Sequence, residues 1–172
     1  MFREKIKVLD CTIRDGGLIN NHNFDIKFVR NVFEAVSKSG VDYMEIGYKN
    51  SKELFDPKDY GPWKFCDDDV IKKTIEGIES NTKISVMADI GRVNLDDIKP
   101  AKESPVDMIR VASYSKDIDK AISMVNHFSQ KGYEKTMTAC LVGWFNYRSG
   151  IFQVRKALPC QVQNKKTSGY AN

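Results

Sequence analysis

The sequence lacks clustered cysteines and long hydrophobic runs, and each absence excludes a class of protein. Its four cysteines, at positions 11, 66, 140 and 160, are far apart and include no Cys-x-x-Cys pair. A disulfide framework or a structural zinc site needs closer, patterned spacing, so we expect reduced thiols. No run approaches the roughly 18 apolar residues of a membrane-spanning helix, so we expect no membrane partner. The first residues hold no apolar core of the secretory kind, so we expect a cytoplasmic protein.

Acidic residues are absent after Glu134, and this divides the chain by charge. Residues 1–141 carry 22 Lys and Arg against 23 Asp and Glu, whereas residues 142–172 carry five basic residues and no acidic one. The net charge of +4 therefore originates in the final segment. Two interpretations of that segment stay open: a basic tail for nucleic acid or anionic surfaces, and an out-of-frame or otherwise foreign C-terminus on a truncated enzyme. Basic and aromatic residues do not cluster on any predicted face, so no nucleic-acid partner is expected.

Apolar residues alternate between strand-like runs and helical stripes over much of the chain. Strands are predicted at 6–13, 41–48, 83–90, 106–113 and 136–142. Helical stripes lie between them, at 29–36, 70–78, 95–102 and 118–128, and the stretch 49–66, which contains Pro and Gly, is predicted to be a long loop. Neither periodicity continues beyond these elements, so we divide the chain into a domain at 1–142 and an irregular tail at 143–172.

Alternating strands and helices are typical of a parallel sheet with right-handed crossovers. Two closures of that sheet fit the sequence: an open, doubly wound sheet and a (β/α)8 barrel. No Gly-x-Gly-x-x-Gly segment follows the first predicted strand, so nothing local supports a dinucleotide-binding fold. A complete barrel needs about 250 residues, more than this chain has.

Charged residues occur within three of the predicted strands, where burial makes them costly unless they are paired. Asp10, Glu45 and Arg110 are each flanked by apolar residues. Asp89 ends the third predicted strand, at the sheet edge where ligands of parallel α/β proteins bind. Two interpretations stay open: an interior ion-pair network that satisfies itself, and a polar cavity that holds a cation or an anionic substrate.

The sharpest local feature is Arg14-Asp15-Gly16-Gly17, at the end of the first predicted strand. An aspartate at a strand end is a suitable ligand for a hard divalent cation. An adjacent guanidinium stabilises an oxyanion that develops beside such a cation. The two glycines allow the backbone to approach a ligand closely.

Residues 9–17 read Leu-Asp-Cys-Thr-Ile-Arg-Asp-Gly-Gly. They strongly resemble the first strand of the metal-dependent carbon–carbon lyases related to hydroxymethylglutaryl-CoA lyase and 4-hydroxy-2-oxovalerate aldolase, whose signature is Asp-x-Thr-Leu/Ile-Arg-Asp-Gly. Residues 20–24 are similar to the continuation of one aldolase-like branch, and residues 43–47 and 107–112 resemble the second and fourth strands. The match runs in order over roughly residues 5–141. It implies an α/β fold: a partial (β/α)8 TIM barrel of about the first four to five βα units, with an irregular basic C-terminal tail.

The resemblance also implies an activity and a site. Enzymes of this family use a divalent metal, usually Mn²⁺ or Mg²⁺, to chelate a keto acid or acyl substrate during aldol or Claisen cleavage. Carried over by position, Arg14 would stabilise the enolate oxygen, Asp15 would ligate the metal and Glu45 would orient the site. Asp89 and Arg110, at and near strand ends, are predicted to contact the substrate.

The sequence departs from the family in its histidines. The family's other metal ligands are a His-x-His pair on a later strand, but this chain has only His22 and His127, and Leu18 stands where the hydroxyoxovalerate aldolases have a histidine base. We expect His22 to be a solvated or packing residue and His127 to lie at the surface.

Two hypotheses about function therefore stay open. One is a lyase resembling 4-hydroxy-2-oxovalerate aldolase, present as its N-terminal part. The alternative is a catalytically inactive half-barrel remnant or interaction module. Because half a barrel exposes sheet edges and apolar helix faces, we also expect self-association.

Overall fold

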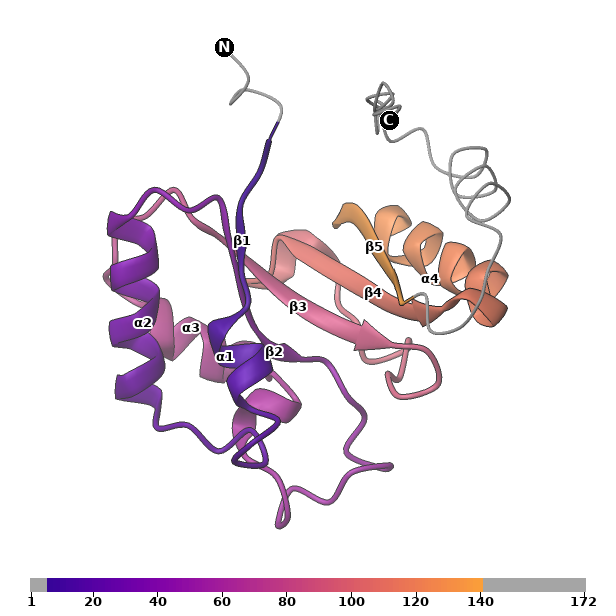
Figure 1. Ribbon diagram of the computed structural model, residues 1–172, viewed down its shortest axis with the longest axis horizontal. Helices are drawn as coiled ribbons and strands as arrows, with labels where there is room; N and C mark the ends of the chain where they lie inside the picture. Colours follow the sequence, from indigo (N-terminus) through magenta and orange to yellow (C-terminus); the bar gives the residue numbers. More distant parts are fainter. Residues whose placement is uncertain (1–5, 141–172) are drawn as a thin grey trace, which may run out of the picture. The chain divides into compact units, whose positions relative to one another are not determined.

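The computed structural model describes residues 6–140, which form five strands in one sheet with helices between them (Figure 1). The strands are β1 (Leu9–Asp10), β2 (Tyr43–Tyr48), β3 (Lys83–Asp89), β4 (Met108–Tyr114) and β5 (Glu134–Cys140). The α-helices are α1 (Thr12–Gly16), α2 (Ile26–Lys38), α3 (Asp68–Ile75) and α4 (Ile118–Gln130). Short 3-10 turns are η2 (Pro62–Lys64), η3 (Ala101–Glu103) and η4 (Ser115–Asp117). The predicted tail at 143–172 lies outside the described residues.

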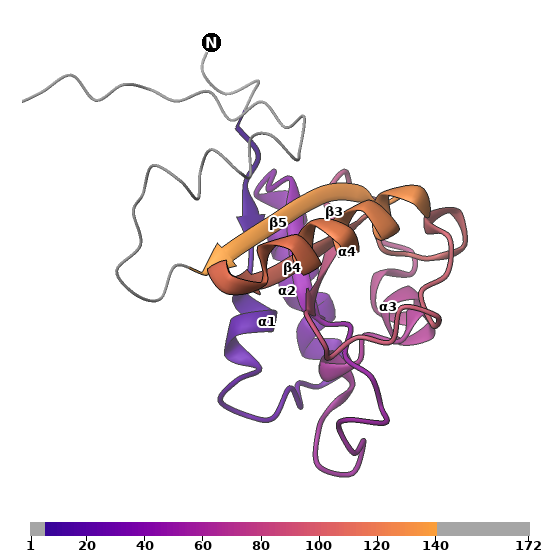
Figure 2. The ribbon, with the colours of Figure 1, turned by 90° about the vertical axis from the view of Figure 1, so that its right-hand side faces the viewer.

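The strands follow one another across the sheet in the order β1-β2-β3-β4-β5, and every neighbouring pair is parallel. In a doubly wound sheet the order reverses at a switch point, whereas in a barrel each strand lies beside the next one in the chain. The strands curl into a half-barrel (Figure 2). The prediction of a partial (β/α)8 barrel is therefore confirmed, and the doubly wound alternative is wrong.

Burial explains why the elements alternate along the chain. Every residue of β2 is buried, as expected for a parallel strand covered on both faces. α2 buries Val29 and Phe33, and Asp25 caps its first turn by accepting hydrogen bonds from the backbone N–H groups of Lys27 (2.8 Å) and Phe28 (3.3 Å). Among residues 6–140, no helix has the length and apolar character needed to cross a bilayer.

Two predicted elements differ from the structure. The first strand covers two residues, and it ends at Asp10 because the carboxylate of that residue accepts hydrogen bonds from the backbone N–H (3.1 Å) and hydroxyl (2.8 Å) of Thr12 and the chain then turns into α1. The predicted helix at 95–102 is wrong, since this stretch forms turns that lead into η3. Pro100 lies inside it, and a proline removes a helical hydrogen bond and restricts the residue before it.

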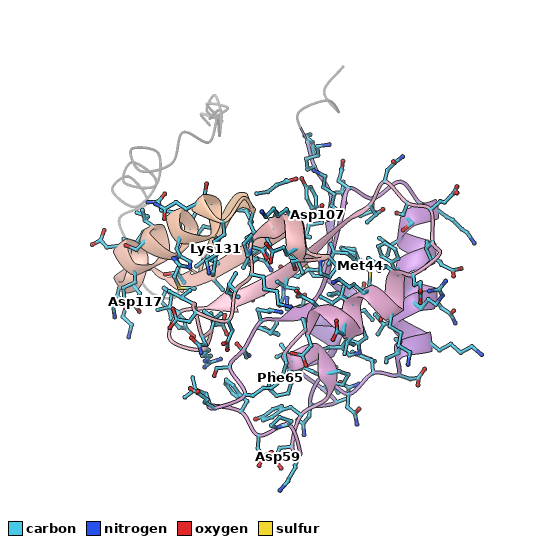
Figure 3. All side chains as sticks on the ribbon, turned by 180° about the vertical axis from the view of Figure 1, so that it is seen from behind. Met44, Asp59, Phe65, Asp107, Asp117 and Lys131 are labelled. Atoms are coloured by element: carbon cyan, nitrogen blue, oxygen red, sulfur yellow. The ribbon has the colours of Figure 1, made fainter. Side chains whose placement is uncertain are left out.

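The long connection between β2 and α3 is a loop, as predicted, and the short 3-10 turn η2 lies near its end. The loop carries exposed Asp59 at its far end, and Phe65, which is buried, lies nearer the sheet (Figure 3). Because this loop leaves the carboxyl end of β2, it is positioned to contribute to a site at that edge of the sheet.

Candidate active site

The centre of the candidate site is Glu45, a fully buried carboxylate in β2. Its Oε1 accepts hydrogen bonds from Arg14 Nε (2.6 Å) and Arg110 Nη2 (2.5 Å), and its Oε2 accepts one from Arg110 Nε (2.6 Å). Charge-assisted hydrogen bonds of this kind offset the cost of removing all three charges from water. Burial alone lowers the pKa of each guanidinium, but the hydrogen bonds and charge of Glu45 outweigh it and raise the pKa of both arginines.

Two of the three charged strand residues form an ion pair in the structure. Glu45 and Arg110 are paired, although they are far apart in the sequence. Asp10 takes no part in this cluster, because its carboxylate caps the turn at Thr12. Cys11 joins the cluster instead: its thiol donates to Glu45 Oε1 at 3.7 Å, and burial together with the charge of Glu45 raises the pKa of that thiol.

Arg14 connects the buried cluster to the exposed edge of the site. Its side chain is mostly buried, and its Nη1 contacts the carboxylate of Asp15, which is 59% exposed. α1 positions both residues, because it begins directly after β1 and packs against β2 through buried Ile13. A guanidinium fixed on one side by Glu45 therefore presents its other side toward solvent beside a carboxylate.

The described residues provide little for a metal ion. Mg²⁺ and Mn²⁺ prefer several oxygen ligands in a nearly octahedral arrangement. Across residues 6–140, no group of three or more His, Cys, Asp or Glu side chains is placed to hold an ion. Asp15 is thus a single candidate ligand, and its carboxylate is paired with Arg14. These residues alone do not fit a complete metal site.

Asp89 lies at the end of β3, apart from the arginine cluster. Its Oδ2 pairs with Arg92 Nη1 at 3.2 Å. Its charge acts on Tyr48, at the end of β2, and on Lys64, in η2. The structure therefore brings Arg14, Glu45 and Arg110 together and places Asp89 beside a different set of side chains.

His22 is a site residue whose position the sequence did not reveal. It is buried, and its ring packs edge-on against Tyr48 with centroids 5.2 Å apart, so the packing interpretation is correct and the solvated one is wrong. Burial, followed by the positive charges of Lys64 and Arg14, lowers the pKa of His22 to about 4, so the imidazole is neutral at physiological pH. A side chain at Gly17 would approach His22 Nδ1 to 2.2 Å, which explains the need for glycine there.

His127, expected at the surface, is half-buried in α4, and its Nε2 is enclosed.

Lys64 is a second unpredicted residue of the site. It is only 8% exposed, and its ammonium lies over the rings of Phe55 (4.4 Å), Tyr60 (4.9 Å) and Tyr48 (5.3 Å). Burial, then the charge of Arg92, lowers the pKa of Lys64, and Asp89 partly opposes this. The sequence contains a signal for this residue. Lys64 stands between Trp63 and Phe65, and Glu45 was singled out by the same pattern of one charged residue with apolar neighbours.

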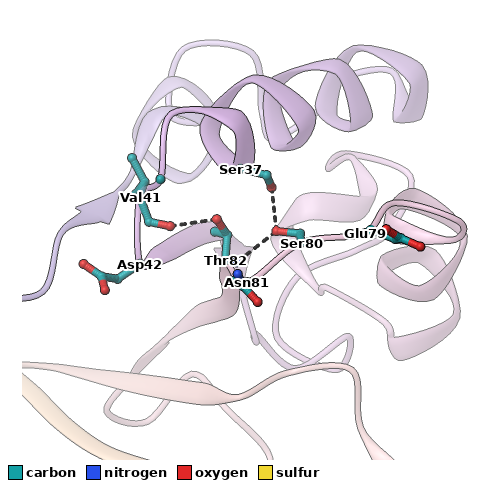
Figure 4. A pocket seen from close by; sticks show the side chains of 8 residues that line it. Ser37, Val41, Asp42, Glu79, Ser80, Asn81 and Thr82 are labelled. Carbon is teal, nitrogen blue, oxygen red and sulfur yellow. Dashed lines mark hydrogen bonds between the residues drawn. The ribbon is translucent and has the colours of Figure 1, made fainter.

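A separate polar hollow lies at the opposite ends of the strands (Figure 4). Its lining includes Asp42, which precedes β2, and Thr82, which precedes β3. The Thr82 hydroxyl donates to the Val41 carbonyl at 2.7 Å, and the Ser80 hydroxyl donates to the Ser37 hydroxyl at 2.8 Å. In parallel barrels the amino-terminal face contributes to stability rather than to ligand binding, which agrees with these internal hydrogen bonds.

The parallel half-barrel defines the chain as part of a (β/α)-barrel protein, and the sequence relatives specify which enzymes it resembles. It is 24% identical over 122 residues to 4-hydroxy-2-oxovalerate aldolase 6 of Rhodococcus jostii, covering 70% of this chain and 33% of the relative. It is 27% identical over 131 residues to 4-hydroxy-2-oxovalerate aldolase 1 of Rhodococcus erythropolis, covering 75% and 37%. The chain thus spans about a third of the length of these relatives, and the resemblance first inferred from residues 9–17 is confirmed. No protein-family model matches the chain.

Solved structures agree with this similarity. The N-terminal domain described as that of an aldolase from Bacteroides vulgatus superposes with a TM-score of 0.62 and 28% identity, covering 78% of this chain and 44% of that one. The carboxyl transferase domain of Rhizobium etli pyruvate carboxylase gives a TM-score of 0.60 at 13% identity, covering 90% and 29%. The second likeness supports the fold alone.

Proposed function

We propose that this chain is an aldolase-like lyase that cleaves or forms a carbon–carbon bond in a small oxo acid or acyl substrate through an enolate. The observation that carries the proposal is Arg14, whose guanidinium is fixed by buried Glu45 and directed toward the carboxyl edge of a parallel half-barrel. The similarity to 4-hydroxy-2-oxovalerate aldolases supports the same class of reaction. Nothing in the comparisons favours an inactive remnant or interaction module.

The role of Arg14 follows from the charge that the reaction develops. Cleavage next to a carbonyl leaves negative charge on the enolate oxygen, and a donor already aimed at that oxygen lowers the barrier without reorganising. Glu45 is the positioning residue, since it holds Nε, while Nη1 on the other side of the guanidinium contacts the exposed carboxylate of Asp15. Arg110 pairs with the same carboxylate through two nitrogens, so Glu45 does not neutralise Arg14 alone.

The metal requirement is a further part of the proposal and rests on the resemblance. Asp15 would be one ligand of Mn²⁺ or Mg²⁺, and such an ion would supply Lewis-acid stabilisation of the substrate oxygens. Because residues 6–140 form no cluster of ligands around Asp15, no step of the reaction is assigned to the ion. We also propose a cytoplasmic location, a small keto acid or acyl compound as the ligand of this edge, and self-association.

Exchange of the methyl protons of pyruvate with D2O, followed by proton NMR with Mn²⁺ or Mg²⁺ present, tests the proposal. The wild-type chain is expected to catalyse exchange. Arg14→Met is expected to slow it about 100-fold or more, the usual cost of removing one preorganised oxyanion donor. Lys38→Met, on the exposed face of α2, serves as the control and should exchange at the wild-type rate. A folded wild-type chain that catalyses no exchange would refute the proposal and favour an inactive half-barrel.

A further inference from the structure

The ammonium of Lys64 is surrounded by aromatic rings, and none of the described carboxylates is bound to it. Phe55, Tyr60 and Tyr48 place their rings within 4.4 to 5.3 Å of Nζ. Among residues 6–140, this ammonium forms no ion pair and donates no hydrogen bond. The rings stabilise the cation through their quadrupoles and fix its position, but they do not neutralise its charge. Nζ still reaches solvent, because it is not among the fully enclosed polar atoms that lack a partner.

The surroundings of Lys64 carry an excess of positive charge. The neighbouring charges are Arg92 and Asp89, and Asp89 is already paired with Arg92 at 3.2 Å. Two cations therefore share one carboxylate at the end of β3. A buried cation without its own counter-ion is costly, and a bound anion would remove that cost. Asn50 adds a further unused donor near this loop: its backbone N–H donates to the Lys64 carbonyl at 3.3 Å, and its buried side-chain amide has no partner among the described residues.

Lys64 belongs to the same site as Arg14 but occupies a separate position in it. Both positive charges lower the pKa of His22, and the Tyr48 ring contacts both His22 and Lys64. The charges that act on Lys64 come from the end of β3, whereas Arg14 is bound to Glu45 in β2. A ligand that reaches both positions must therefore extend from the arginine cluster past Tyr48.

We propose that Lys64 binds an anionic group at the distal end of the oxo-acid substrate, which makes the substrate class a dianion with a carboxylate or phosphate remote from the enolate. This inference rests on the proposed function, because it takes the reacting end to lie at Arg14. A lysine ammonium is a compact point charge that suits either kind of anion. A substrate such as 4-hydroxy-2-oxovalerate ends in a methyl group, so the proposed preference would set this chain apart from enzymes that act on that compound.

The test compares two ligands that differ in one group: 2-oxoglutarate and 2-oxopentanoate, which lacks the distal carboxylate. The chain is labelled with lysine carrying ¹³C at Cε, and the Lys64 signal, shifted by the three rings, is followed by NMR during each titration. We expect 2-oxoglutarate to bind at least about tenfold more tightly than 2-oxopentanoate, the effect of one charge-assisted hydrogen bond, and to move the Lys64 signal. Lys64→Met should abolish the difference. Lys58→Met, an exposed lysine in the same loop, should preserve it.

Each outcome decides between the two proposals. Equal affinity for the two ligands in the wild type together with no response of the Lys64 signal to inorganic phosphate, or a preference that persists in Lys64→Met, overturns the assignment of Lys64. If Lys64→Met does not fold, the wild-type Lys64 signal decides, since it must move with 2-oxoglutarate and not with 2-oxopentanoate. Saturable movement with inorganic phosphate but not with 2-oxoglutarate supports the anion site and favours phosphate over carboxylate as its group. Pyruvate exchange without the preference refutes the anion site only, and the preference without exchange refutes the lyase only.

Discussion

Replacing Glu45 with glutamine tests whether the buried cluster stabilises the fold as its geometry implies. The carboxylate accepts three hydrogen bonds of 2.5 to 2.6 Å from Arg14 and Arg110. Glu45→Gln keeps the shape but removes the buried carboxylate that both guanidinium groups share, and it turns an amide N–H₂ toward one of them. Removing one partner of a buried ion pair costs about 3–5 kcal/mol, so we expect a loss of that size in the free energy of unfolding.

Urea unfolding followed by circular dichroism measures this loss. Glu34→Gln is the control, because Glu34 lies on the solvent-accessible side of α2 and pairs with Arg30 at 3.6 Å, a surface pair worth less than about 1 kcal/mol. The double variant Glu45→Gln with Arg110→Met should recover part of the loss, since it removes one of the two cations that shared the carboxylate. A loss below about 1 kcal/mol for Glu45→Gln would refute the reasoning, and a double variant that is worse than the single one would show that Arg110 contributes mainly by packing.

Two further predictions concern titration and association. The pKa of His22 is lowered to about 4 in the folded chain from its usual 6.5. The unfolded chain therefore binds the extra proton first, and the free energy of unfolding should fall as the pH falls from about 6.5 toward 4. Urea midpoints at several pH values should show this slope in wild type and His127→Gln and a smaller one in His22→Phe. Leu18 and Ile19 are 62% and 91% exposed, so light scattering should detect dimers or larger species, and Ile19→Lys should reduce them. A wild-type monomer with a cooperative melt would contradict that expectation.

The alternation of strands and helices was predictable because burial imposes a period on the sequence. β2 and the central residues of β3 are buried and mostly apolar, and α4 buries Ala121, Met124, Val125 and Phe128 at helical spacing. The length of β1 was not predictable from hydrophobicity, since a side-chain hydrogen bond from Thr12 to Asp10 ends it. The helix expected at 95–102 ignored Pro100, which a stricter use of backbone chemistry would have excluded.

The candidate site was predictable where a residue's neighbours in sequence identify it. Glu45 and Arg110 were singled out as charges in buried strands, but their pairing depends on strand register. Ser85 lies opposite both Glu45 and Met108, and Arg110 follows Met108 by two residues, so it projects from the same face of the sheet and reaches Glu45. The aromatic enclosure of Lys64 depends on how a long loop folds back on Tyr48, and no periodicity encodes that contact.

Burial and pairing give the two cationic positions different tasks. Arg14 shares a buried carboxylate with Arg110, so its orientation is fixed and only one side of its guanidinium faces the exposed edge. Such a group suits a charge that appears briefly at a defined point, as on an enolate oxygen. Lys64 is held by aromatic rings that leave its charge unneutralised, which suits a charge that the ligand carries throughout. Substitution at Arg14 should therefore reduce turnover, whereas substitution at Lys64 should reduce affinity for dianionic ligands and change turnover less.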